Sequence, residues 1–283
     1  MRRLPLITAA ALAVTAALGA APSATAAQLD YVAMGDSYSA GSGILPLASG
    51  SNPLCTQSAV NAAHVISSAK GFTLKDVTCG GAQTKDFAGN QFGVVAPQYN
   101  ALSADTDLVT LTIGGNDGNV FVNNVLTCGT LGTLTLGIGK PCTNHFGSSQ
   151  FDLINNQTYP ALVQTLQGIK ARAPKARIAI AGYPQIMPQD GTSCFFTMPI
   201  AKGDVPYLNQ LEKTLNSAVS RAAAATGVTY VDMWTASTGR DACKPAGTRW
   251  VEPALWGTNY VPVHPNAAGE RAYANQYIAT LGL

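Results

Sequence analysis

Four short blocks of the sequence carry residue types suited to nucleophilic chemistry. Ser37 lies in Gly35-Asp36-Ser37-Tyr38-Ser39, and His264 lies in Val263-His264-Pro265-Asn266. A serine hydroxyl is a poor nucleophile until an imidazole takes its proton, and the same imidazole can then protonate a leaving group. The other two blocks, Gly80-Gly81 and Gly114-Gly115-Asn116-Asp117, offer backbone N–H groups and a neutral amide donor. A serine in a turn is by itself more often a helix N-cap than a nucleophile, so the fold around these blocks decides their role.

The strand pattern places three of these blocks where strands end. Short runs rich in β-branched and apolar residues, each bounded by turn residues, are typical of buried strands. We expect strands at Asp30–Met34, Phe72–Val77, Leu108–Ile113, Arg177–Ala181 and Val228–Val231. The first three end at the turns that hold Ser37, Gly81 and Asn116.

Helical patterns alternate with these strands. Helices are expected at Ala59–Ala69, Tyr159–Arg172, along the apolar stripe Leu208, Leu211, Leu215 and Val219, and at about Pro265–Leu281. This alternation predicts right-handed βαβ units and one three-layer α/β domain with a parallel sheet. Ligands of such sheets bind beyond the carboxyl ends of the strands, which is where the three blocks meet.

One segment departs from the alternation. Residues Asn119 to Ser149 are rich in Gly, Thr and Leu, show no clear periodicity and contain Cys128 and Cys142. A stretch this long without regular structure is usually a functional loop, so we expect a loop held by its own disulfide.

Composition and charge narrow the class of protein. Of the 283 residues, 47% are hydrophobic, which excludes a disordered chain, and 11% are charged, so the polar surface is largely uncharged. Arg2 and Arg3 fall in the predicted leader described next, and the rest of the chain holds 15 basic and 15 acidic residues. A basic surface for nucleic acid is therefore not expected.

The first 26 residues are typical of a secretory signal peptide. Arg2 and Arg3 precede an apolar stretch from Leu4 to Ala21, and Ala24-Thr25-Ala26 matches a cleavage site. We therefore predict a signal peptide at 1–26 and a secreted, extracellular domain at 27–283, with no integral membrane segment in the mature chain.

The mature part contains six cysteines, at positions 55, 79, 128, 142, 194 and 243. An even number in an exported chain favours three disulfides, for which fifteen connectivities are possible. Because there is no CxxC and no paired histidine, a metal site is not expected.

The four blocks, in this order and at these strand ends, resemble the SGNH or GDSL hydrolase family over essentially the whole mature chain. The resemblance implies a three-layer α/β/α fold with a central parallel sheet of about five strands. It also implies a serine ester hydrolase that forms an acyl-serine intermediate and needs no cofactor. By position, Ser37 would be the nucleophile and His264 its general base. The backbone N–H groups of Ser37 and Gly81 and the Asn116 amide would form the oxyanion hole.

The chain departs from the family pattern at one position. The family usually has Asp three residues before the catalytic histidine, whereas this chain has Val261. Similar secreted actinobacterial members orient the histidine with a main-chain carbonyl, so we expect the carbonyl of Val261, or one next to it, to do so here. The alternative is a carboxylate from elsewhere, with Asp232 and Glu252 as candidates.

The resemblance is to secreted Streptomyces-type lipases, esterases and phospholipases. It implies the disulfides Cys55–Cys79, Cys128–Cys142 and Cys194–Cys243. Because the chain has few charges and a Leu- and Gly-rich loop, a lipid acyl ester is the favoured substrate. A monomer is the expected state. The alternatives are a carbohydrate O-deacetylase on the same fold and an exported binding protein without catalytic activity.

Other candidate residues have ordinary structural explanations. His64 is expected to be packed or on the surface and His145 to be a solvated loop residue, while Asp36 and Asp117 hold their turns. Five aromatic residues are candidates to line an acyl groove, and these are Tyr38, Phe195, Phe196, Trp250 and Trp256.

Overall fold

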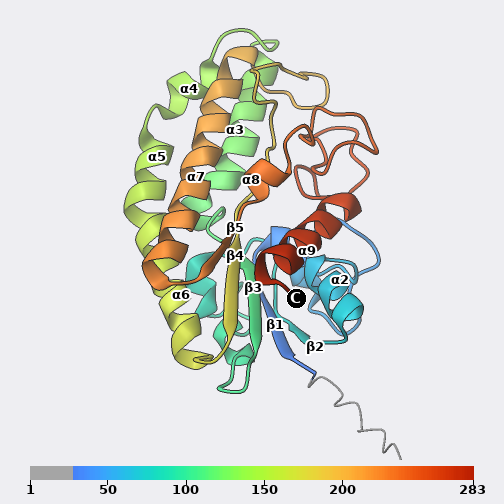
Figure 1. Ribbon diagram of the computed structural model, residues 1–283. Coiled ribbons are helices and arrows are strands. Elements are labelled where there is room, and N and C mark those ends of the chain that lie inside the picture. Colours follow the sequence, from blue (N-terminus) through green and yellow to red (C-terminus); the bar gives the residue numbers. More distant parts are fainter. Residues whose placement is uncertain (1–27) are drawn as a thin grey trace, which may run out of the picture.

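The centre of the protein is a sheet of five parallel strands (Figure 1). We describe a computed structural model, which covers residues 28–283; the predicted leader lies outside these residues. The strands are β1 (Asp30–Gly35), β2 (Thr73–Asp76), β3 (Leu108–Thr112), β4 (Arg177–Ala181) and β5 (Thr229–Val231). Their order in the sheet is β2-β1-β3-β4-β5, which confirms the predicted α/β class.

The inner strands are apolar because helices cover both faces of the sheet. Every residue of β3 is buried, and in β1 all but Asp30 are. Parallel strands buried on both sides need such continuous runs, which is why the sequence signal at residues 108–112 is the clearest in the chain.

The longer helices form the two outer layers. Helices α6 (Tyr159–Arg172) and α7 (Val205–Thr226) pack together on one face, and α2 (Ala62–Lys70) and α9 (Ala267–Leu281) pack together on the other (Figure 1). The remaining helices are α1 (Ser37–Ala40), α3 (Val120–Leu134), α4 (Pro141–Phe146), α5 (Ser149–Leu153) and α8 (Met233–Ala236). A π-helical segment, Ile154–Thr158, joins α5 to α6. Short 3-10 turns lie at Pro53–Cys55, Thr84–Phe87, Gln98–Ala101, Asp117–Asn119 and Lys202–Asp204.

Two helices begin later than their apolar patterns predict because an asparagine caps each of them. The Asn61 side chain accepts from the His64 N–H, so α2 begins at Ala62. The Asn266 side chain accepts from two backbone N–H groups, so α9 begins at Ala267. Asparagine is among the strongest N-cap residues, since its side chain satisfies donors that the first turn leaves unpaired.

The loop predicted at Asn119 to Ser149 is wrong, because most of this segment is helical. It forms α3 and α4, which the Cys128–Cys142 disulfide joins. Gly and Thr lower helix propensity, but tertiary packing overrides that weak preference. At Gly132 a Cβ would lie 2.2 Å from the Pro199 carbonyl, so the glycine allows α3 to contact that segment closely.

All six cysteines form disulfides, in the three pairs that the family resemblance implied. Cys55–Cys79 links a 3-10 turn to the segment after β2, and Cys194–Cys243 joins two long loops. Within residues 28–283, no helix has the length and apolar character needed to cross a membrane.

Candidate active site

Ser37 lies in the turn between the central strand β1 and the short helix α1. At Gly35 the backbone has φ +115°, and a Cβ there would lie 2.3 Å from the Thr112 carbonyl, so only glycine fits. Asp36 caps α1 by accepting from the Tyr38 N–H at 2.9 Å. Glycine and the cap together fix the backbone on which the Ser37 hydroxyl is presented, with 8% of the residue exposed.

His264 meets Ser37 although 227 positions separate them in sequence. Its Nε2 lies 2.7 Å from Ser37 Oγ, the distance of a short hydrogen bond. The segment that holds the histidine is anchored on both sides: the Tyr38 hydroxyl donates to the Val263 carbonyl at 2.7 Å, and the Glu252 N–H donates to the His264 carbonyl at 2.9 Å. The predicted pairing of serine and imidazole therefore has the geometry that proton transfer requires.

The carbonyl that faces the other ring nitrogen belongs to Pro262, so Val261 itself is wrong and the neighbouring carbonyl that was also expected lies at this place. His264 Nδ1 lies 2.7 Å from the Pro262 carbonyl oxygen. The reason is the left-handed backbone of Val263, with φ +58°, which turns the chain so that a carbonyl two residues before the histidine faces its ring. With Nδ1 donating to this carbonyl, Nε2 is the nitrogen free to accept from serine.

The two carboxylates considered as alternatives serve other elements. Asp232 caps α8 and accepts from the N–H and hydroxyl of Thr235. Glu252 is paired with Arg249 at 2.6 Å and accepts from the Asn266 side chain. Within residues 28–283, His264 has no carboxylate at hydrogen-bonding distance.

Burial sets the protonation of the site. It lowers the pKa of His264 to about 4, an effect that the hydrogen bond to the Pro262 carbonyl partly opposes, so the imidazole is neutral at neutral pH and can accept a proton. Burial also raises the pKa of Asp36 to about 7, while hydrogen bonds from the Tyr183 hydroxyl and the Tyr38 N–H work against that rise. Tyr183 in turn accepts from the Gly115 N–H at 2.8 Å and so links the turn after β1 to the turn after β3.

The strand order places donors on both sides of Ser37. Strand β1 lies between β2 and β3, so the turn with Ser37 lies between the turn with Gly81 and the turn with Asn116. Neither the Ser37 N–H nor the Gly81 N–H donates to a carbonyl elsewhere in the described chain. The Asn116 amide donates one hydrogen to the Ala82 carbonyl at 3.1 Å, which leaves its second hydrogen available. This arrangement fits a pocket for a developing oxyanion.

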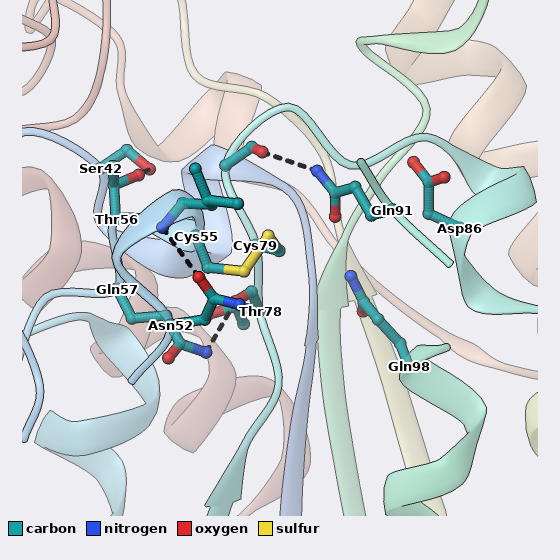
Figure 2. Close-up of a disulfide and its surroundings, with 12 residues drawn as sticks. Ser42, Asn52, Cys55, Thr56, Gln57, Thr78, Cys79, Asp86, Gln91 and Gln98 are labelled. Atoms are coloured by element: carbon teal, nitrogen blue, oxygen red, sulfur yellow. Dashed lines mark hydrogen bonds between the residues drawn. A yellow bond between two sulfur atoms is a disulfide. The ribbon is translucent and has the colours of Figure 1, made fainter. Parts of the chain in front are cut away.

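The backbone at Gly80 and Gly81 is held by contacts that no sequence motif predicted. Figure 2 shows Gln91 Nε2 donating to the Gly80 carbonyl, at 2.8 Å, and the adjacent Cys55–Cys79 disulfide. The Gly80 carbonyl and the Gly81 N–H belong to one planar peptide unit, so fixing the oxygen also fixes the direction of the N–H. Gln91 is therefore a positioning residue for the predicted oxyanion donor.

A cavity opens beside His264 and continues between α3 and α7. Its volume is about 850 Å³, counting the space at its open mouth. Phe121, whose ring lies edge-on to His264 at 5.5 Å between centroids, forms one wall with Gly115 and Val263. The remaining lining is almost entirely apolar and consists of Val120, Asn124, Val125, Gly129, Ile154, Tyr183, Ile186, Met187, Met198, Pro199, Ile200, Leu208, Leu211, Glu212, Leu215 and Ala254.

The aromatic residues expected to line an acyl groove do not line this cavity. Phe196 and Trp256 are 86% and 84% exposed, and Phe195 and Trp250 are partly buried elsewhere. Tyr38 contacts the His264 ring at 5.0 Å between centroids, but its hydroxyl serves to anchor Val263. Side chains of α3, of α7 and of residues 186–200 line it instead.

Among the residues that line this cavity, Glu212 is the one with an ionisable carboxyl group. No sequence pattern identified it as a candidate. Its Oε2 accepts from the Ile186 N–H at 3.2 Å, whereas its Oε1 is buried with no hydrogen-bond partner among the described residues. Burial raises the pKa of Glu212 to about 8, so the group is mostly protonated at neutral pH and adds little charge to an apolar cavity.

The remaining candidates lie outside the site. His64 contacts Asn61 and lies 3.5 Å from Asp76, and His145 is exposed on α4. Asp117 accepts from the backbone N–H and the hydroxyl of Thr84, so it ties its turn to the 3-10 turn at Thr84–Phe87 and does not act only within its own turn as expected. Within residues 28–283, no group of three or more His, Cys, Asp or Glu side chains could hold a metal ion.

Comparison with known proteins identifies the family. The GDSL-like Lipase/Acylhydrolase family matches residues 33–272. Lipase 2 of Streptomyces coelicolor is 52% identical over 291 aligned residues, which cover 100% of this chain and 98% of that protein.

Solved structures agree in fold. The crystal structure of phospholipase A1 from Streptomyces albidoflavus has a TM-score of 0.73 at 29% identity and covers 88% of this chain and 98% of its own. The extracellular lipase from Streptomyces rimosus also has a TM-score of 0.73, at 28% identity, and covers 89% and 99%. The chain therefore belongs to the GDSL-like lipase/acylhydrolase family and is an ester hydrolase of the serine type.

Proposed function

We propose that the protein is a secreted lipase or phospholipase that cleaves long-chain acyl esters through an acyl-Ser37 intermediate. The observation that carries the proposal is the 2.7 Å contact between Ser37 Oγ and His264 Nε2 beside a large apolar cavity. The similarity to a lipase and a phospholipase A1 supports a lipid ester as substrate.

In the first half of the reaction, His264 Nε2 takes the proton of Ser37 as Oγ attacks the ester carbonyl carbon. The carbonyl oxygen becomes an oxyanion, which the N–H groups of Ser37 and Gly81 and the Asn116 amide stabilise. The tetrahedral intermediate then expels the alcohol, which takes the proton from the imidazolium. The acyl group is left on Ser37 as an ester.

In the second half, water replaces the alcohol. His264 takes a proton from water as its oxygen attacks the acyl-Ser37 carbonyl, and the same donors hold the new oxyanion. Collapse breaks the bond to Ser37 Oγ, which recovers its proton from the imidazolium. A free carboxylic acid leaves. The Pro262 carbonyl keeps Nδ1 protonated, so Nε2 is the accepting nitrogen in both halves.

The cavity supports a long acyl chain over an acetyl group. Its lining is almost wholly apolar and extends from Phe121 and Val263, beside His264, along α3 and α7, which is a longer apolar surface than two carbons can cover. Burial of each CH₂ group contributes about 0.8 kcal/mol, so a chain that fills the cavity gains binding energy that an acetyl ester lacks.

Initial rates on three substrates test this assignment. We expect hydrolysis of a long-chain phospholipid or a triglyceride to be much faster than that of an acetylated sugar. Activity confined to acetyl groups would contradict the proposal and favour a carbohydrate deacetylase.

Labelling tests whether Ser37 is the nucleophile. A fluorophosphonate ester should label the wild-type protein stoichiometrically, and the Ser37→Ala variant should take up no label. A folded wild-type protein that takes up no label would instead favour a non-enzymatic binding protein.

The dyad makes a separate prediction. Because Asp232 only caps α8, Asp232→Asn should keep activity within about tenfold of wild type, whereas removing a triad carboxylate costs ~10⁴-fold. A thousandfold loss would show that a carboxylate orients His264.

Secretion is supported by three disulfides and by an extracellular relative. The test is to sequence the N-terminus of the protein recovered from the medium of an exporting host. We expect it to begin near Ala27 or Gln28; an intact Met1 would contradict cleavage.

A further inference from the structure

We propose that one end of the molecule, around the mouth of the cavity, inserts into the surface of an anionic lipid bilayer. The proposal rests on the proposed lipid substrate and adds the surface that would bring the enzyme to it. Five exposed apolar side chains form this surface, which we call the apolar rim: Leu136, Ile138, Phe196, Leu255 and Trp256.

The rim residues are far apart in sequence but lie on segments that contact one another. A Cβ at Gly137, between Leu136 and Ile138, would lie 2.9 Å from the Phe195 ring, which packs against Phe196. The Leu255 N–H donates to the Thr197 carbonyl at 2.9 Å. The loop after α3 lies beyond the carboxyl ends of the strands, at the top of Figure 1, and these contacts bring the other two segments to it. The rim is therefore one surface, of a kind that soluble monomers seldom expose without a function.

The rim is continuous with the cavity that would hold the acyl chain. Ala254, next to Leu255, lines the cavity, as do Met198 and Pro199, which follow Phe196 closely in sequence. Helix α3, which leads into the Leu136 segment, supplies further lining. A bilayer in contact with the rim would thus lie against the segments that line the cavity.

The backbone presents two of the rim residues in an unusual way. Leu136 has φ +52° and Trp256 has φ +62°, which lie in the left-handed region that bulky residues rarely adopt. Such conformations persist where the surrounding structure fixes them, and they concentrate at functional sites. The fold therefore determines the backbone conformation at these two residues, whose side chains are exposed.

The charges beside the rim favour an anionic surface. In the segments 134–140, 195–202 and 254–257 the charged residues are Lys140 and Lys202, and both are exposed. The backbone joins them to the rim, since the Lys202 N–H donates to the Gly137 carbonyl. The adjacent carboxylate of Asp204 is buried and accepts from Cys142 and Thr143, so it faces the protein. Basic residues near a membrane surface each contribute to binding of anionic lipids.

Binding to vesicles tests the proposal without any hydrolysis. The Ser37→Ala protein is mixed with vesicles of phosphatidylcholine containing phosphatidylglycerol, and the bound fraction is measured by co-sedimentation. We expect binding that weakens about tenfold or more when Phe196→Ser and Trp256→Ser are added, since two aromatic groups are lost from the inserted surface. Lys140→Ala with Lys202→Ala should remove the preference for anionic over neutral vesicles.

The matched control is Leu45→Ser, which removes an apolar side chain of 68% exposure outside the rim. It should bind vesicles as the parent protein does. Equal binding by the rim variant and the parent would overturn the proposal, as would an equal loss in the control. Binding of the Ser37→Ala parent with no preference for anionic over neutral vesicles would overturn the role of the lysines. Thermal melting of each variant identifies any that fail to fold, and single substitutions then replace the pair.

Rates separate this surface from the proposed function. In the enzyme with Ser37 intact, Phe196→Ser and Trp256→Ser together should reduce turnover of bilayer phospholipid far more than turnover of a soluble butyrate ester. If the enzyme binds vesicles but cleaves only acetylated sugars, the proposed lipid substrate is wrong and the proposed membrane-binding surface is still supported. If the enzyme cleaves long-chain esters in solution but does not bind vesicles, the proposed membrane-binding surface is wrong and the proposed lipid substrate is still supported.

Discussion

The two walls of the site are built by different means. One wall, which we call the turn wall, consists of the turns after β1, β2 and β3, where glycines and backbone hydrogen bonds fix Ser37, Gly81 and Asn116. The other, the cavity wall, consists of side chains from α3, α7 and residues 186–200, with few polar contacts. In the proposed mechanism the turn wall supplies the reacting and stabilising atoms, and the cavity wall would hold the acyl chain of the substrate.

This difference predicts different responses to substitution. A hydrogen-bond donor in the turn wall must lie within a few tenths of an ångström of a developing charge, so its loss should lower kcat. Cavity side chains contribute apolar area, so their replacement should change the preference among substrates and leave the bond-making step largely intact.

Asn116→Ala should give the largest effect of the substitutions considered for the two walls. It removes one proposed oxyanion donor, and such losses typically reduce kcat by ~100- to 1000-fold. KM should change little, because the donor acts mainly in the transition state. Steady-state kinetics on one soluble ester measure both constants, with the exposed Asn100→Ala as control. A loss confined to KM would place Asn116 in substrate binding instead.

Gln91→Leu tests the turn wall one step further from the chemistry. Without the side-chain donor, the Gly80 carbonyl loses its 2.8 Å hydrogen bond and the Gly81 N–H loses its fixed direction. A hydrogen bond is worth about 1 kcal/mol, so kcat should fall by about tenfold or less. Addition of Gln91→Leu to Asn116→Ala should cost less than the two separate effects combined if both act on one oxyanion. Full additivity would argue against a shared role.

Gly129→Leu tests the cavity wall. A Cβ at this position makes only ordinary contact, 3.8 Å from the Pro199 side chain, so the added side chain can occupy space within the cavity. The ratio of kcat/KM for a 16-carbon ester to that for a 4-carbon ester should fall by several-fold, since each excluded CH₂ costs about 0.8 kcal/mol of binding. An equal fall for both esters would mean that the substitution disturbs the catalytic residues.

The same contrast explains what the sequence could predict. The bounds expected for Tyr159–Arg172 and Arg177–Ala181 match α6 and β4, because helical spacing, Pro174 and β-branched residues all agree there. The pairing of Ser37 with His264 was likewise accessible, but through the family resemblance that the four ordered motifs carry. The turns that hold Ser37, Gly81 and Asn116 were accessible because strand ends and glycine turns are local features of the sequence.

Features that depend on packing between distant segments were not accessible. The sequence of α3 predicts a loop because Gly and Thr have low helix propensity. Contacts with residues 199–201, which the sequence pattern does not show, stabilise the helix. Gln91 and Glu212 had no motif, since a glutamine 11 residues from its partner and a carboxyl among apolar side chains acquire roles only in three dimensions. The carbonyl of Pro262, and not that of Val261, faces the His264 ring because Val263 has a positive φ angle, which the sequence does not reveal.

Glu212 is the charged residue in the otherwise almost entirely apolar cavity wall. Its replacement by glutamine should change the stability of the protein by an amount that depends on pH. Burial raises the pKa of Glu212 to about 8 from an ordinary value of 4.5. Between these values the folded state holds a proton that the unfolded state has released, so wild-type stability from this group falls as pH rises from 4.5 to 8. Below pH 4.5 both states hold the proton, and above about pH 8 the loss is complete.

The amide of the Glu212→Gln variant does not titrate, and its oxygen can still accept from the Ile186 N–H. The melting temperature of the variant minus that of wild type should therefore be near zero at pH 4.5 and rise steadily toward pH 8. Because only the difference is taken, titration of other buried groups, such as Asp36, largely cancels. The exposed Asp105→Asn provides the control and should show no such rise. A difference that stays constant with pH would mean that the Glu212 carboxyl is already ionised in the cavity, where it would face any acyl chain as a charge.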